Sequence, residues 1–388
     1  MRTPRALFGA AVAVVVVMSV AGGVAASSTV VVRPGDVGTS WLAGSRPGGT
    51  SSFVTGPATA PLGVGSLQFT TASSSASAEL LNYSFIGTPL ANFDAISYRA
   101  YRASSSTNPT TQTVALALEV DVNGPDTAGG FATLIFEPDY QSGGNAAMQT
   151  DTWQTWDAYQ GGNAIWWATK DIPGAPVAFN TFVPWSVILA ANPQATIMGG
   201  VGLFVGSGWD GQFTGYGDAL RIGVGGNTTT YNFEPAAALI VTAPNATAVQ
   251  GDAIATFVPS YGGFMYGDTA ASLTTQPTCA TTATSGSPVG PYPITCSGAA
   301  SANYTITYVP GTLDVVAAAT AAPSVLPTEQ VGGATATPVS APTPPPTSAD
   351  GRLAGNGDTT PLIALLICTV SGILGLLAVE RQRRSLRR

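Results

Sequence analysis

The sequence contains no histidine, and its single lysine is Lys170. The absence of histidine excludes Ser-His-Asp and Cys-His catalysis and histidine-ligated zinc sites. Charged residues make up only 9% of the 388 residues, and the formal net charge is −7. Nucleic-acid binding requires clustered Lys and Arg, so this composition argues against nucleic acid as a partner. The chemistry that remains open depends on carboxylates.

The N-terminus has the features of a secretory signal peptide. Arg2 and Arg5 precede an apolar run over residues 7–20, and small residues follow up to Ala26. This order of a basic, an apolar and a small-residue segment is typical of signal peptides. We expect cleavage after Ala26 and exclude residues 1–26 from the fold. A retained N-terminal anchor is the alternative.

The C-terminal region predicts a transmembrane helix over residues 361–379. This stretch of about 19 residues carries no charge and would reach roughly 28 Å as a helix, which is enough to span a bilayer. Residues 380–388 add five arginines, and the positive-inside rule keeps such a tail in the cytoplasm. We therefore expect a single-pass cell-membrane protein with an extracellular or periplasmic body. No complete Leu-Pro-x-Thr-Gly signal precedes the span, so permanent anchoring is favoured over transfer to a cell wall.

Residues 318–360 are rich in Pro, Thr, Ala and Ser. Such a composition cannot bury enough apolar surface to fold, and its prolines favour an extended backbone. We expect this segment to be a stalk between the folded body and the membrane.

Residues 27–235 show the alternation and turn signals of short strands. Over residues 113–122, apolar side chains occur at every second position, and the Gly-containing segment that follows leads into a second strand-like run. This pattern predicts a β-hairpin. Further short strand-like runs and the lack of long amphipathic helices predict an all-β domain, a jelly-roll-like β-sandwich.

Residues 236–317 contain "QGD" (250–252), "YGGFMYGDT" (261–269), "SPVGPYPI" (287–294) and "NYTITYVPGTLDV" (303–315) in that order. The segment is similar to the MBG-type module, an immunoglobulin-like β-domain of bacterial secreted and surface proteins. Gln250 stands where an aromatic residue is usual. The resemblance implies a small Ig-like domain that serves as a spacer or adhesin-like module, with no catalytic residues.

Cys279 and Cys296 are the only cysteines between the predicted signal peptide and the predicted span. Outside the cytosol, two such cysteines on neighbouring strands are expected to pair as a disulfide that closes a loop of about 17 residues.

Tryptophan is concentrated between residues 153 and 185, and two interpretations stay open. The rings either fill the core and brace loops, or some lie exposed where sugar rings stack. Because successive strand residues face opposite ways, we expect one of Trp166 and Trp167 to be buried and the other to face outward. The spacing of Trp153 and Trp156 suggests a loop or short turn. The candidate ligand-binding residues are Trp166, Trp167, Trp153, Trp156 and Trp209.

Calcium is the candidate cofactor, because two stretches carry several oxygen ligands. The same residues are also common in turns, so plain turn chemistry is the alternative. The candidate ligands are Glu119, Asp121, Asn123, Asp126, Asp210 and Asp218.

These observations predict a membrane-anchored bacterial cell-surface protein that is not an enzyme. We expect its N-terminal domain to serve adhesion or to bind an extracellular ligand, either a glycan or a surface protein. One alternative is a structural spacer without a ligand. Another is a carbohydrate-active enzyme, which would need two carboxylates across a cleft. Glu119 and Glu137, on the two sides of the predicted hairpin, with Asp139 and Asp157 nearby, are the candidates for that pair.

Overall fold

The computed structural model describes residues 26–124, 129–141, 148–171, 181–206, 208 and 210–320. Within these ranges the chain is all-β, as predicted, and its one α-helix is the short α2 (Trp185–Ala191). No helix in the described ranges is long and apolar enough to cross a membrane. The predicted span at 361–379, the basic tail, residues 1–25 of the predicted signal peptide and most of the predicted stalk lie outside these ranges.

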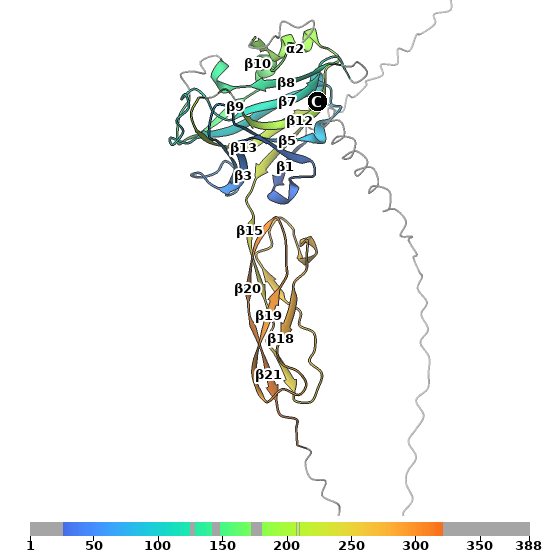
Figure 1. Cartoon of the computed structure of the whole chain (residues 1–388). Coiled ribbons are helices and arrows are strands. Elements are labelled where there is room, and N and C mark those ends of the chain that lie inside the picture. Colours follow the sequence, from blue (N-terminus) through green and yellow to red (C-terminus); the bar gives the residue numbers. More distant parts are fainter. Residues whose placement is uncertain are drawn as a thin grey trace, which may run out of the picture. The chain divides into compact units, whose positions relative to one another are not determined.

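The alternating segments up to residue 235 form two seven-stranded sheets that face each other as a β-sandwich. The first sheet contains β1 (Ser27–Val32), β3 (Gly49–Thr55), β4 (Gly65–Thr71), β6 (Phe93–Arg102), β9 (Trp153–Asp157), β13 (Phe213–Val224) and β14 (Asn227–Phe233). The second sheet has the order β11 (Val183–Pro184), β10 (Ile165–Ala168), β8 (Phe131–Phe136), β7 (Ala115–Asp121), β12 (Thr196–Val205), β5 (Ser77–Asn82) and β2 (Trp41–Arg46). Figure 1 shows β8, β7, β12 and β5 side by side.

The first sheet forks along β13. β6 pairs with one edge of β13 over most of its length. The other edge pairs first with β4, up to Gly217, and then with β14, from Leu220 onward. Asp218 and Ala219 therefore lie where β4 and β14 diverge, and Ala219 has a positive φ of 51°. We call this place the fork.

The core between the two sheets follows the predicted alternation. Leu116, Leu118 and Val120 of β7 are fully buried, and the predicted hairpin is present as the antiparallel pair β7–β8. Bulky aromatic rings complete the packing, among them Trp166 and Trp185, whose ring centroids lie 5.3 Å apart. Removal of this apolar surface from water is the main driving force for the sandwich.

The C-terminal strands form two smaller sheets. A three-stranded sheet has the order β17 (Ser260–Gly262), β15 (Ala237–Thr242) and β20 (Tyr304–Val309). A four-stranded sheet has the order β16 (Ala246–Val249), β21 (Gly311–Val316), β19 (Gly290–Ser297) and β18 (Thr278–Thr281). Between them Val241, Ile294 and Leu313 are buried, so this module has an apolar core of its own.

The predicted disulfide is confirmed. Cys279 and Cys296 lie opposite each other in the antiparallel pair β18–β19 and are bonded. The bond closes a loop whose ends are 17 residues apart, and a cross-link of this size restricts the unfolded chain.

Candidate functional site

The two neighbouring tryptophans of β10 lie on opposite faces of the second sheet. Trp166 is 0% exposed and packs in the sandwich core, where its indole N–H donates to the carbonyl oxygen of Ala158 over 3.0 Å. Trp167 is half-buried and belongs to an apolar cluster on the opposite face. The prediction that one ring is buried and the other faces outward is therefore confirmed.

Trp167 lies on what we call the outer face, the face of the second sheet turned away from the core. Strand register places one row of residues across this face, running Leu42, Leu81, Gly202, Ala117, Ile135 and Trp167. Leu81, Ala117 and Ile135 of this row are buried, and Tyr83 and Phe204 pack against the same cluster. The outer face therefore carries a second, smaller apolar layer flanked by aromatic rings.

Carboxylates accompany this aromatic layer. Glu137 follows the last residue of β8, and its Oε2 accepts a hydrogen bond of 3.1 Å from the indole N–H of Trp167. Glu119 projects from β7, and its Oε2 accepts 2.8 Å hydrogen bonds from the Tyr83 hydroxyl and the Gly200 N–H. These bonds hold both acidic side chains in defined positions beside the apolar cluster.

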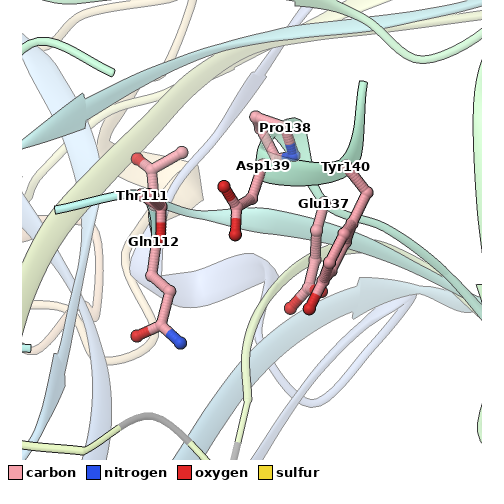
Figure 2. A pocket seen from close by; sticks show the side chains of 7 residues that line it. Thr111, Gln112, Glu137, Pro138, Asp139 and Tyr140 are labelled. Atoms are coloured by element: carbon pink, nitrogen blue, oxygen red, sulfur yellow. The ribbon is translucent and has the colours of Figure 1, made fainter. Parts of the chain in front are cut away.

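A hollow opens next to Glu137, and we call it the Glu137 hollow. It is lined by Thr111, Gln112, Thr113, Glu137, Pro138, Asp139 and Tyr140. Figure 2 shows the Asp139 carboxylate between Thr111 and Gln112 on one side and Glu137 and Tyr140 on the other. The side-chain groups that line the hollow are thus mainly oxygen-bearing.

The environment of the hollow affects its ionisable groups. Burial raises the pKa of the Asp139 carboxyl, and a hydrogen bond with Thr111 opposes this shift. Within the described part of the chain, Oδ1 of Asp139 is buried and has no hydrogen-bond partner. Burial also raises the pKa of the Tyr140 phenol, and the neighbouring Glu137 and Asp139 add to that rise. The hollow therefore offers hydrogen-bond acceptors, one of which lacks a donor.

An exposed aromatic pair borders the hollow. The rings of Tyr140 and Phe182 lie 4.1 Å apart at an interplanar angle of 33°, and the two residues are 46% and 37% exposed. An exposed stack of this kind presents apolar ring surface to solvent next to polar groups. Neither residue is among the candidates predicted from the sequence. Their 42-residue separation gives no local signal, and only the fold brings them together.

The remaining tryptophan candidates lie elsewhere. Trp153 and Trp156 are in β9, paired with β6 of the first sheet, so the expectation of a loop or short turn for them is wrong. The indole N–H of Trp153 donates to the Pro57 carbonyl oxygen over 3.1 Å, and Trp156 packs against the sandwich core. Both side chains therefore brace the first sheet. Trp209 lies outside the described residues.

The structure separates the candidate calcium ligands. Glu119 and Asp121 lie on β7, and Oδ1 of Asp121 accepts from the Asn123 N–H over 3.0 Å, as in a turn. Asp218 lies in the other sheet, at the fork, and Asp126 lies outside the described residues. Asp210 precedes β13 and is exposed. In the described ranges no three or more Asp, Glu, Cys or His side chains form a group suited to a metal.

Comparison with known proteins identifies one module. Residues 239–314 match the family model of the MBG domain (YGX type), which confirms the predicted MBG-type domain in this part of the chain. No curated protein matches the chain.

Two solved structures are similar to the chain. One reports the structural basis for the promiscuous specificity of carbohydrate-binding modules of the β-sandwich superfamily. It is 15% identical, with 48% of this chain and 58% of that chain covered and a TM-score of 0.26. The other is a β-1,2-glucanase from Parabacteroides distasonis, 10% identical, with 71% of this chain and 37% of that chain covered and a TM-score of 0.26. The chain thus spans less than two thirds of either protein.

Proposed function

We propose that this is a membrane-anchored bacterial surface protein whose jelly-roll-like N-terminal sandwich binds an extracellular glycan without catalysis. The observation that carries the proposal is the exposed Tyr140–Phe182 stack beside the acceptor-lined Glu137 hollow. In this proposal the MBG-type module and the stalk hold the sandwich away from the membrane.

The chemistry of the hollow fits a neutral sugar. The apolar C–H faces of a sugar ring pack on aromatic rings, and a few placed polar groups fix its orientation. Carboxylates such as Glu137 and Asp139 accept hydrogen bonds from hydroxyl groups. They also repel anionic sugars, in keeping with the net charge of −7. A neutral glycan therefore fits better than a sulfated or uronic one.

A second candidate function is glycoside hydrolysis, because two carboxylates, Glu137 and Asp139, line one hollow. Retaining and inverting glycosidases use a carboxylate pair, one member of which is held protonated by a raised pKa. The raised pKa of Asp139 suits a proton donor. The hydrogen bond from Trp167 to Glu137 instead suits a binding group held in place. Release of reducing ends from a bound glycan would favour the enzyme.

Binding of the full-length protein to a glycan array tests the proposal. Tyr140→Ala and Phe182→Ala should each reduce binding at least tenfold while the protein stays folded, because both rings are exposed and carry little of the core. Tyr308→Ala is the matched control, since Tyr308 is an exposed aromatic residue of the MBG-type module at 37% exposure. Its binding should equal that of the wild type.

Three results would contradict the proposal. They are an array with no selective signal, binding that survives both aromatic substitutions, and equal loss in the Tyr308 control. The first would favour a structural spacer, which is the competing interpretation. Glu137→Gln adds a polar test, because glutamine can still accept from the Trp167 indole but lacks the charge. It should weaken glycan binding less than Tyr140→Ala.

A further inference from the structure

An amide side chain lines the Glu137 hollow among its carboxylates. Gln112 borders the hollow together with Glu137, Asp139 and Tyr140. One end of its amide group accepts hydrogen bonds and the other end donates them. The end that faces the hollow therefore decides whether Gln112 adds a further acceptor to the carboxylates or sets a donor against them.

A buried contact fixes the orientation of this amide. Nδ2 of Asn108, a residue that is 3% exposed, donates to Oε1 of Gln112 over 2.9 Å. Because the Gln112 oxygen bonds to Asn108, the Gln112 nitrogen Nε2 is turned away from that contact. Figure 2 shows this nitrogen on the side of the Gln112 side chain that faces Glu137 and Tyr140. Gln112 therefore presents N–H groups to the hollow.

Asn108 is itself held in place by contacts to its backbone. The guanidinium group of Arg102 is buried, and its Nη2 donates to the main-chain oxygen of Asn108 over 2.7 Å. The main-chain N–H of Asn108 donates to the main-chain oxygen of Gln212, just before β13, over 3.2 Å. The interior of the sandwich thus determines which end of the Gln112 amide faces the hollow.

An acceptor and an aromatic ring lie across the hollow from Gln112. Figure 2 shows Glu137 and Tyr140 next to each other on that side. The Glu137 carboxylate accepts from the Trp167 indole, and an ionised carboxylate has room for about four hydrogen bonds, so it can accept another. The hollow thus arranges a fixed donor, a fixed acceptor and an apolar ring around one space.

An acetamido group matches all three features. Its carbonyl oxygen accepts a hydrogen bond and its N–H donates one, in opposite directions, because the amide is planar and trans. Its methyl group is apolar and gains from contact with a ring. A hydroxyl group can make the polar contacts but has no apolar part. An ammonium group carries only donors, so it would bring a positive charge against the Gln112 N–H groups.

We propose that Gln112 makes the hollow selective for 2-acetamido sugars, an inference that rests on the glycan binding proposed above. Nε2 of Gln112 donates to the acetamido oxygen, and Glu137 accepts from the acetamido N–H. The methyl group packs against the Tyr140 ring inside the hollow. The sugar ring lies outside it, on the exposed stack of Tyr140 and Phe182.

Binding of the full-length protein to an array of matched glycans tests this selectivity. The glycans, in the glucose and galactose series, differ only in an acetamido, hydroxyl or amino group at C2. The wild type should bind the acetamido form at least tenfold more tightly than the other two. Gln112→Glu keeps an oxygen for Asn108 but removes the donor, so the acetamido form should bind no better than the hydroxyl form. Gln250→Glu, at an exposed position of the MBG-type module, is the matched control and should keep the wild-type ratio.

Asn108→Asp provides a second variant that leaves the lining of the hollow unchanged. It replaces the donor to Gln112 by an acceptor, so Gln112 should turn its nitrogen toward position 108 and its oxygen toward the hollow. The ratio of acetamido to hydroxyl affinity should again fall at least tenfold, with the fold checked by circular dichroism.

The possible failures are distinguishable. The selectivity is overturned, and the proposed glycan binding stands, if the wild type binds the hydroxyl or amino form as tightly as the acetamido form. It is also overturned if a folded Gln112→Glu or Asn108→Asp protein keeps the wild-type ratio. Absence of binding to every glycan on the array would overturn the proposed function itself and the selectivity with it.

Discussion

Trp166 and Trp167 are adjacent in β10, yet the first packs in the sandwich core and the second packs on the outer face beside Glu137. This arrangement follows from the two-residue period of a strand. Each ring therefore has different neighbours and makes a different contribution to the free energy of unfolding.

We expect Trp166→Ala to destabilise the protein by about 3–5 kcal/mol, since it removes a fully buried ring and leaves a cavity. Trp167→Ala should cost roughly half as much, because its ring is only half-buried and less apolar area returns to water. Chemical denaturation followed by tryptophan fluorescence measures both values. Equal losses would contradict the assignment of the two faces.

The disulfide of the MBG-type module should be a local stabiliser. Replacing Cys279 and Cys296 together by Ala should lower the stability of this module by about 3 kcal/mol, as expected for a loop of this length. Differential scanning calorimetry should show a lower melting temperature for that transition. A wild-type protein in reductant should behave like the double variant, and the glycan binding that we propose for the sandwich should stay unchanged.

Asp218 predicts a specific pH dependence of the protein's stability. Burial raises its pKa from 3.8 to about 6, and hydrogen bonds from Phe233, Ala219 and Leu62 only partly oppose this. The folded state therefore holds a proton that the unfolded state has lost between about pH 4 and pH 6. Stability falls as pH rises through this window, by up to about 3 kcal/mol, and levels off above it.

The difference in stability between the wild type and Asp218→Asn isolates this effect, since asparagine does not titrate. Urea denaturation from pH 4 to pH 7 should give a difference that changes across the window. Asp314→Asn should keep the slope of the wild type. A difference that stays constant with pH would show that Asp218 titrates normally.

Gly63 lies in the loop before β4, and Gly225 follows β13. The two glycines allow a matched comparison of the same substitution at two positions with positive φ. Their φ values are 58° and 59°, but a Cβ at Gly225 would have open space around it, whereas one at Gly63 would overlap Glu234. Both Ala variants should lower the free energy of unfolding by roughly 1–2 kcal/mol, because alanine is strained in the left-handed backbone conformation. Gly63→Ala should lose about 1–3 kcal/mol more through overpacking. Thermal unfolding of both variants checks this, and equal losses would mean that the loop moves freely away from Glu234.

Local patterns sufficed for much of the fold. The alternation over β7 predicted its buried residues and its hairpin with β8, and the cysteine spacing and motifs predicted the disulfide and the MBG-type domain. These features depend on residues close in sequence. Alternation could not show that Ala115 and Ala117, on the opposite side of β7, are buried as well. Their burial depends on Tyr83, Trp167 and Phe204, which come from three other segments.

The candidate site depends on contacts between distant segments, and for that reason local sequence patterns do not predict it. Tyr140 and Phe182 are brought together only by the strand order of the second sheet. Asp218 was named among the calcium candidates because of its residue type, but no local pattern indicates that Glu234 is buried near it. Glu234 follows a strand and reads as an ordinary boundary residue until the fork places it under the Gly63 loop. The loop expected at Trp153 and Trp156 is instead a strand, because pairing with β6 overrides their irregular spacing.

The parallel pairing of β1 with β14 sets the order in which the sandwich can form. Ser28 meets Thr229, a partner 201 residues further along the chain. A chain that emerges N-terminus first must keep β1 without its partner until nearly the whole sandwich has been made. Contacts this distant in sequence form late and slowly. β1 is therefore the first strand to be synthesised and the last to pair. Until β1 pairs with β14, the edge of β14 stays open to other chains.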